Sequence, residues 1–263
     1  MAVSPLRLAS SRPCNDFKIL YNYLFRELSR AGPKINMPTI YVINPNSTEA
    51  VTAAIDEALE PLRSNDGPEI ECVTLTEGPP GIESQRDVDS VIAPLLKRAA
   101  ALENHAAAFV IACFSDPGLH SLREQSARPA FGIAECGVLT ALSIAQRFGV
   151  IAILPASIPR HLRYFGAMGV TNRLAAELAI NVGVVDLANE DLALSRMTDC
   201  GRTLRDVHGA DVVVMGCAGM TKYRPILEAA LRIPIVEPAQ AAVTMATGRV
   251  RLGGTAKTFG GVA

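Results

Sequence analysis

The chain has 263 residues, of which 49% are hydrophobic and 19% charged, enough apolar material to form the core of one large domain or two modest ones. Its net charge of −1 and its lack of Trp exclude the basic surface and the aromatic platform that nucleic-acid-binding proteins commonly use. The longest apolar run, 106–114, is much shorter than the roughly 20 residues that cross a bilayer. We therefore expect a small-molecule substrate as partner, with no nucleic acid and no membrane.

Six cysteines are scattered along the chain, which opens without the continuous apolar core of a signal peptide. Disulfide frameworks belong mainly to small secreted proteins, so these cysteines are better read as reduced thiols. We predict a cytoplasmic protein, and we expect it to be a homo-oligomer.

Residues 1–36 differ from the rest because they are rich in Lys and Arg and carry an amphipathic patch around 17–28. Met37 stands just before the first clear strand. An additional helix or an upstream start site explains this segment better than a targeting peptide, whose Arg and Ser bias would be stronger. We treat 1–36 as an N-terminal extension outside the functional core.

From Thr39 onward, short β-branched runs alternate with segments of helical periodicity. The predicted strands are TIYVIN (39–44), IECVTL (70–75), AAFVIACF (107–114), PAFGI (129–133), GVIAILP (149–155), INVGVVDL (180–187), DVVVMGC (211–217) and IPIVE (233–237). The predicted helices cover 49–62, 87–101, 119–127, 136–148, 159–168, 190–207, 225–231 and 239–248. This alternation predicts parallel βα units in two sets of four strands.

The two sets resemble each other, which indicates an internal duplication. Cys217 in DVVVMGC follows Cys113 in AAFVIACF by 104 positions, and Pro155 follows Pro45 by 110 in a second pair of similar motifs. We predict an α/β fold of two pseudo-symmetric Rossmann-like domains, each with a four-stranded parallel sheet, and an active site in the cleft between them. The first domain would start at 37 and end at 132, and the second would span 133–237.

Cys113 and Cys217 end equivalent strands, so the predicted symmetry would place them on opposite walls of one cleft, as a two-base reaction requires. A turn into a helix follows each cysteine, and a helix N-terminus would lower the thiol pKa toward neutrality and hold an enolate oxygen. A buried structural role is the alternative for each cysteine alone, and it remains our interpretation of the other four.

Several further residues are candidates for substrate binding because they also follow strands. Asn46 and Ser47 stand between the first strand and the first helix, where an N-cap role is compatible with ligand contact. The loop EGPPGIES (77–84) contains Gly81 and Ser84 and forms either a substrate cradle or a plain surface turn. The remaining candidates follow the two cysteines directly: Phe114, Ser115, Ala218, Gly219 and Met220.

The sequence offers no pattern for a metal or a cofactor. It has no Cys-x-x-Cys pair, its His residues lack paired ligand spacing, and neither a dinucleotide nor a nucleotide-triphosphate motif occurs. We therefore predict chemistry that uses neither a metal nor a cofactor.

The motifs INPNST, GPPGIES, ACFSDPGL, GIAE and GCAGM, in this order over nearly all of 38–245, resemble the hydantoin and allantoin racemase branch of the aspartate/glutamate racemase superfamily. The resemblance implies two pseudo-symmetric α/β domains, with the C-terminal segment 238–263 completing the first. It also implies metal-free racemisation by a cysteine pair, which falls on Cys113 and Cys217. Glu135 in GIAE matches an acidic position that can assist a cysteine, and a salt bridge at a helix start is the alternative.

The resemblance is incomplete in two places. The residues around both cysteines depart from those of aspartate and glutamate racemases, which disfavours a free amino acid as substrate. Hydantoin racemases usually carry Thr-Leu-Pro-Arg-Ser where this chain has Ile153 to Ser157, with Ala156 in place of Arg. We predict a racemase of a 5-substituted hydantoin or an allantoin-like ureide. The alternatives are an amino acid racemase, an enzyme like maleate isomerase or arylmalonate decarboxylase, and a non-catalytic protein that binds a small ligand.

Overall fold

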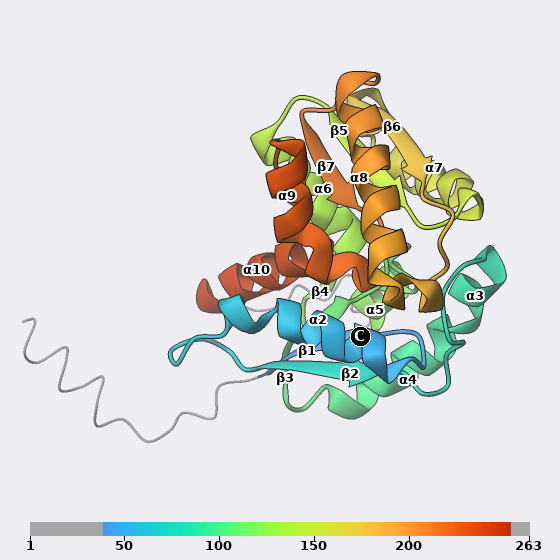
Figure 1. The fold of residues 1–263 in the computed structure, drawn as a ribbon. Coiled ribbons are helices and arrows are strands. Elements are labelled where there is room, and N and C mark those ends of the chain that lie inside the picture. The colour runs from blue at the N-terminus through green and yellow to red at the C-terminus, as the bar shows by residue number, and fades with distance from the viewer. Residues whose placement is uncertain (1–38, 254–263) are drawn as a thin grey trace, which may run out of the picture. The chain divides into compact units, whose positions relative to one another are not determined.

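The computed structural model describes residues 39–253, so the predicted N-terminal extension lies outside the described residues. Two four-stranded parallel sheets organise the described part of the chain (Figure 1). The first has the order β2-β1-β3-β4, with β1 (Thr39–Asn44), β2 (Ile70–Thr74), β3 (Ala106–Ile111) and β4 (Ala130–Gly132). The second has the order β6-β5-β7-β8, with β5 (Phe148–Ala152), β6 (Leu174–Ala179), β7 (Val212–Met215) and β8 (Ile235–Val236). The predicted fold class is confirmed.

Alternating side chains of β1 place the first sheet between two layers of helices. Ile40 and Val42 pack in the same apolar cluster as Val51 and Ile55 of α2. Tyr41 and Ile43 point to the opposite face, where a second cluster holds side chains of α4 and α5. The helices and turns that follow the strands of this sheet are α2 (Glu49–Ala58), η1 (Glu60–Leu62), α3 (Gln85–Ser90), α4 (Ile92–Leu102) and α5 (Leu119–Gln125).

The second sheet continues the alternation of strands and helices. Its helices and turns are α6 (Ile133–Ile144), η2 (Pro155–Ser157), α7 (Ile158–Ala167), η3 (Thr171–Arg173), η4 (Val185–Ala188), α8 (Glu190–Asp206), η5 (Ala218–Tyr223), α9 (Arg224–Leu231) and α10 (Pro238–Arg251). We call residues 39–132 the first half and 133–237 the second half. The two sheets share one strand order, as an internal duplication would produce.

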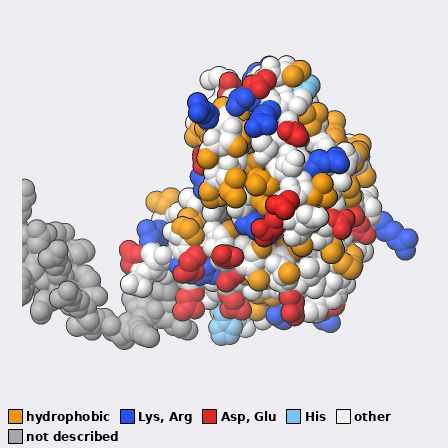
Figure 2. Space-filling model, in the orientation of Figure 1, with side chains coloured by type: hydrophobic (Ala, Val, Ile, Leu, Met, Phe, Trp, Pro, Cys, Tyr) orange, Lys and Arg blue, Asp and Glu red, His pale blue; other side chains and the backbone are white. Residues whose placement is uncertain are grey.

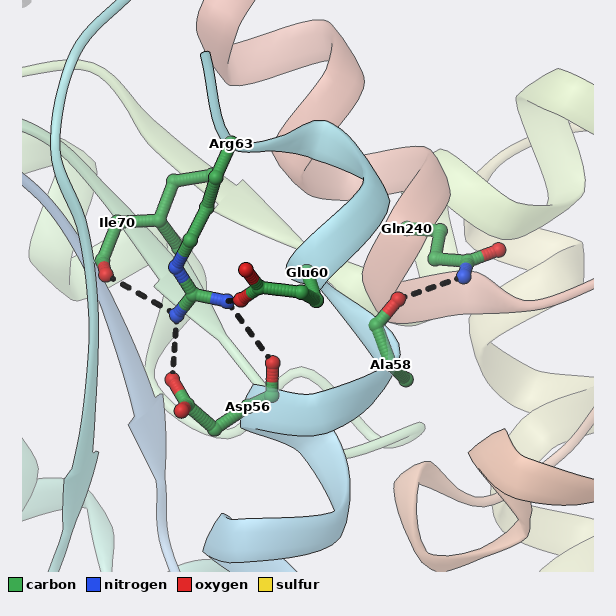
Figure 3. A network of polar contacts seen from close by, with 6 residues as sticks. All are labelled: Asp56, Ala58, Glu60, Arg63, Ile70 and Gln240. Atoms are coloured by element: carbon green, nitrogen blue, oxygen red, sulfur yellow. Dashed lines mark hydrogen bonds and ion pairs between the residues drawn. The ribbon is translucent and has the colours of Figure 1, made fainter. Parts of the chain in front are cut away.

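The C-terminal helix α10 follows the second sheet in sequence but packs against β1, β3 and β4 of the first sheet. Figure 3 shows a polar contact between α10 and the first half. Gln240 of α10 donates its side-chain N–H to the Ala58 carbonyl at the end of α2 (2.7 Å). In the same view Arg63 binds Asp56 and the Ile70 carbonyl, which ties the end of α2 to β2. The domain boundaries at 132 and 237 stay a prediction.

Four predicted elements differ from the structure by a division or by several residues at both ends. The predicted helix 136–148 is α6, which begins at Ile133 and ends at Ile144, and the predicted helix 49–62 is divided into α2 and η1 at Leu59. The predicted strand 180–187 is wrong, because the strand is β6 at 174–179, which ends before Ile180. The predicted helix 87–101 is divided into α3 and α4 at Val91. Pro94 explains the division, since it lacks the N–H that a continuous helix would donate to Ser90.

Two further observations concern the distribution of basic side chains on the surface and the length of the helices. On the face drawn in Figure 2, the Lys and Arg side chains are scattered rather than gathered in one stripe. Among residues 39–253, no helix is long and apolar enough to span a membrane.

Candidate active site

Cys113 and Cys217 lie at matching positions in the two halves. Cys113 stands two residues after the end of β3, and Cys217 stands two residues after the end of β7, the third strand in the order of its own sheet. Both cysteines line a single cavity that holds about 410 Å³ of empty space, part of it open to solvent. The predicted placement of two thiols at one cavity therefore agrees with the geometry.

The cavity has an apolar wall and a polar wall. Val51 of α2 and the loop residues Ile82 and Val184 supply apolar side chains. The polar wall comes from Ser115, which follows Cys113 closely, and from Ser157, Arg160 and His161 around the start of α7. A cavity with both kinds of lining suits a small, partly polar ligand.

Two loops from opposite halves meet beside the cavity. A carboxylate oxygen of Glu83 accepts the Val184 backbone N–H (2.8 Å), which joins the loop after β2 to the loop after β6. A Cβ atom at Gly81 would come within 2.9 Å of the Val184 side chain, so only glycine permits this approach. Ile82 and Val184 are thereby held as neighbours at the rim.

Burial dominates the acidity of both thiols. It raises the pKa of Cys113 to about 12 and the pKa of Cys217 to about 11. One backbone N–H faces each sulfur and lowers the pKa in part, that of Ser115 at Cys113 and that of Gly219 at Cys217 (3.4 Å). The expectation of near-neutral thiol pKa values is wrong, because desolvation outweighs these single hydrogen bonds.

Charges near Cys113 act in opposite directions on its pKa. A negative charge on Cys217 raises the pKa of Cys113, so the two thiols disfavour simultaneous ionisation. Arg160 lowers the pKa of Cys113 through its positive charge. The cavity therefore favours one thiolate beside one thiol over two thiolates.

Arg160 is buried and held in place by polar contacts within the polar wall. Its Nε donates to the Ser115 hydroxyl (3.0 Å), and its terminal nitrogens donate to the Ser157 hydroxyl and the Ala156 carbonyl (both 3.4 Å). These contacts aim a permanent positive charge at the cavity that also contains the thiols.

His161 forms a second buried feature of the same wall. Its Nδ1 lies 2.5 Å from Oε1 of Glu177 on β6, and the two side chains are only 3% and 1% exposed. The Phe114 ring packs edge-on against the imidazole, with ring centroids 5.2 Å apart. The described residues contain no group of three His, Cys, Asp or Glu side chains that could hold a metal ion.

Residues 40–246 match the family described as Asp/Glu/hydantoin racemase. The chain belongs to this family. It is 34% identical over 218 residues to the hydantoin racemase of Paenarthrobacter aurescens, covering 81% of this chain and 92% of that protein. The racemase is therefore an isomerase.

Solved structures agree with this assignment. The allantoin racemase from Klebsiella pneumoniae superposes on the racemase with a TM-score of 0.80 and 31% identity, covering 85% of this chain and 91% of that one. An arylmalonate decarboxylase shares the fold alone, with a TM-score of 0.59 and 19% identity over 82% of this chain and 94% of that one.

The structure brings some of the predicted substrate-binding residues of the racemase to the cavity and leaves others outside its lining. Those that line it are Asn46, Phe114, Ser115, Ala218 and Gly219. Those that do not are Ser47, Gly81, Ser84 and Met220. Ser84 caps α3, Met220 is fully buried, and Thr48 rather than Asn46 or Ser47 is the N-cap of α2.

Glu135 of the racemase lies outside the cavity lining and forms an ion pair instead. Both of its carboxylate oxygens accept hydrogen bonds from Arg123 (2.8 and 3.1 Å). The acidic side chain that acts on the Cys113 pKa is Asp116, whose carboxylate accepts the N–H groups of Ala134 and Glu135 and the Tyr164 hydroxyl. Burial raises the pKa of Asp116 to about 7.

Sequence reasoning missed Arg160, His161 and Glu177 of the racemase. Arg160 stands one helical turn after the exposed Ala156. The signal available in the sequence was the pair Arg160-His161 on the first turn of a predicted helix that begins at a strand end. Glu177 gave a second signal, because it is a lone charge within an Ala-rich strand.

Proposed function

We propose that this racemase interconverts the enantiomers of a 5-substituted hydantoin or an allantoin-like ureide by two-base proton transfer between Cys113 and Cys217, without a cofactor. The observation that carries the proposal is that both thiols line one cavity from equivalent strand ends of the two halves. The substrate class is taken from the named relatives, a hydantoin racemase and an allantoin racemase.

The proposed reaction moves one proton off the stereocentre and returns another on the opposite face. One cysteine, as thiolate, takes the proton from C5 of the ring, and the electron pair left on C5 spreads onto the neighbouring carbonyl oxygen as an enolate. The other cysteine, as thiol, then gives its proton to C5 from the far side. The thiol and thiolate have exchanged places, so the reverse reaction starts from the other sulfur.

The electrostatics of the cavity suit this exchange. Mutual repulsion keeps one sulfur protonated while the other is charged, which is the pairing that a two-base step requires. Arg160 supplies a fixed positive charge that stabilises the enolate oxygen as it develops.

Serine substitution of each cysteine tests the proposal. Cys113→Ser and Cys217→Ser should each lower racemisation at least ~10²-fold, because a hydroxyl is too weak an acid or base at neutral pH. Each variant should still exchange solvent deuterium into one enantiomer, the one whose proton faces the remaining cysteine. Polarimetry and mass spectrometry in D₂O measure the two effects, with and without EDTA.

Cys200→Ser is the matched control, since Cys200 lies outside the cavity lining and its thiol donates to the Leu178 carbonyl. The control should keep wild-type activity. Exchange of both enantiomers by both variants would indicate a single-base mechanism and contradict the proposal. Activity that disappears with EDTA and returns with a divalent metal would contradict the cofactor-free part.

A further inference from the structure

The buried pair of His161 and Glu177 has no part in the proposed proton transfer, although His161 lines the cavity. Glu177 Oε1 lies against His161 Nδ1, while its Oε2 is buried without a hydrogen-bond partner. Burying such a pair carries a desolvation cost, which is a reason to look for a functional role. Within residues 39–253, no hydrogen bond to His161 Nε2 is found, which leaves that nitrogen available to a ligand.

Two charged side chains lie next to His161. Arg160 is the preceding residue and lines the same cavity. The Glu177 carboxylate lies against Nδ1. In the tautomer that donates Nδ1–H to this carboxylate, Nε2 carries a lone pair and is a hydrogen-bond acceptor.

Aromatic packing fixes the ring that carries this acceptor. Phe114 packs edge-on against His161, and the Phe165 ring centroid lies 6.3 Å from the imidazole centroid. Together with the hydrogen bond from Nδ1, these contacts hold the ring in one orientation. A preorganised acceptor discriminates between ligands more sharply than a mobile one.

We propose that His161 Nε2 accepts a hydrogen bond from a ring N–H of the substrate, while the neighbouring Arg160 donates to an adjacent carbonyl oxygen. This inference rests on the proposed function and deepens it by naming the feature of the substrate that is recognised. An acceptor next to a donor is complementary to the N–H and C=O groups that alternate around a ureide ring. A free carboxylate offers only acceptor oxygens. Its lone pairs would face the lone pair of Nε2, so Nε2 would have no hydrogen-bond donor.

The test compares a 5-substituted hydantoin with its N1-methyl and N3-methyl derivatives. In the wild-type enzyme, kcat/KM for at least one methyl derivative should be about tenfold or more below that of the parent, the cost of one unpaired buried acceptor. His161→Phe keeps an aromatic ring in place. In this variant kcat/KM for the parent hydantoin should fall, and the ratio of kcat/KM for the methyl derivative to that for the parent hydantoin should move toward one. His120→Phe, an exposed position on α5, is the matched control and should keep the wild-type ratio.

Nitrogen-15 NMR of the His161 ring in the wild-type enzyme gives a second readout that needs no variant. The free protein should show Nδ1 protonated and Nε2 unprotonated, and the Nε2 signal should shift when racemic hydantoin is added. An unchanged methyl-to-parent ratio in His161→Phe, or an Nε2 that is protonated or insensitive to ligand, would overturn the inference. A wild-type enzyme that racemises neither a 5-substituted hydantoin nor allantoin would overturn the proposed function and this inference with it.

Discussion

At the scale of single residues, the thiol pKa values make activity depend on pH. Because burial raises the pKa of Cys217 to about 11 and that of Cys113 to about 12, the thiolate becomes more abundant as pH rises through 7 to 10. We expect kcat/KM, corrected for the rate without enzyme, to rise by up to about tenfold per pH unit over this range. A pH series with the parent hydantoin measures it.

The rate of iodoacetamide alkylation at Cys217, followed by peptide mass spectrometry, should rise in parallel in the free enzyme. Its midpoint should lie above the value of about 8.5 that is typical of a free cysteine. A profile that is flat between pH 7 and 9 would indicate thiolates already formed at neutrality. It would contradict the raised pKa values.

The residues of the cavity were predictable only where they follow a strand. Cys113 and Cys217 could be found because both end apolar strands at related positions, which sequence displays directly. Arg160 could not be placed, because whether a helical arginine faces solvent or a cavity depends on the crossing of α7 over the first half. Its contact with Ser115 joins positions 45 residues apart, and no local pattern reports such a contact.

At the scale of elements, Asp116 connects the loop after β3 with two helices of the second half. Its backbone has a positive φ of 43°, and its carboxylate binds the N-terminus of α6 and Tyr164 of α7. A Cβ atom at Gly132 would come within 2.2 Å of this carboxylate, so the two residues are fitted to each other. The loop that carries Cys113 is positioned by this link.

Removing the Asp116 carboxylate should therefore destabilise the protein and weaken catalysis. We expect Asp116→Ala to lower the free energy of unfolding by roughly 2–4 kcal/mol, since a buried N–H group and a partly buried one lose their acceptor. Tyr164→Phe removes one hydrogen bond and should cost about 1 kcal/mol. Urea denaturation measures both effects, and equal stabilities for Asp116→Ala and wild type would rule out the link.

The edge strand β6 shows where local patterns mislead. Its sequence LAAELA is rich in Ala and lies mostly half-buried, whereas 180–187 carries the β-branched residues typical of strands. Val182 and Val184 are buried outside the sheet, because both belong to the larger apolar cluster and Val184 also lines the cavity. Burial beside a cavity and burial in a sheet select the same residue types.

At the scale of the whole described chain, the contact between Glu83 and Val184 joins the two halves across the cavity. We expect Glu83→Ala to raise KM for the hydantoin several-fold, because the rim loops lose their hydrogen bond. Hydrogen exchange at the Val184 amide should accelerate in the same variant. Glu83→Gln keeps an acceptor oxygen and serves as the control. Unchanged exchange at Val184 in Glu83→Ala would contradict this role.

The duplication made the architecture predictable, since two similar sets of four βα units require two similar sheets. It could not predict the differences between the halves, because those come from residues without a counterpart in the repeat. Arg160 and the pair of His161 and Glu177 belong to the second half alone, and both features line or support one wall of the cavity.

The unequal surroundings of the two thiols have a thermodynamic limit. Enantiomers have equal free energies in water, so the equilibrium constant of racemisation is one and kcat/KM must be equal in the two directions. The difference between a pKa of about 12 and one of about 11 cannot bias the final mixture. The difference affects only the separate values of kcat and KM, which can differ between the two enantiomers while kcat/KM stays the same. The two mirror-image substrates therefore saturate the enzyme at different concentrations.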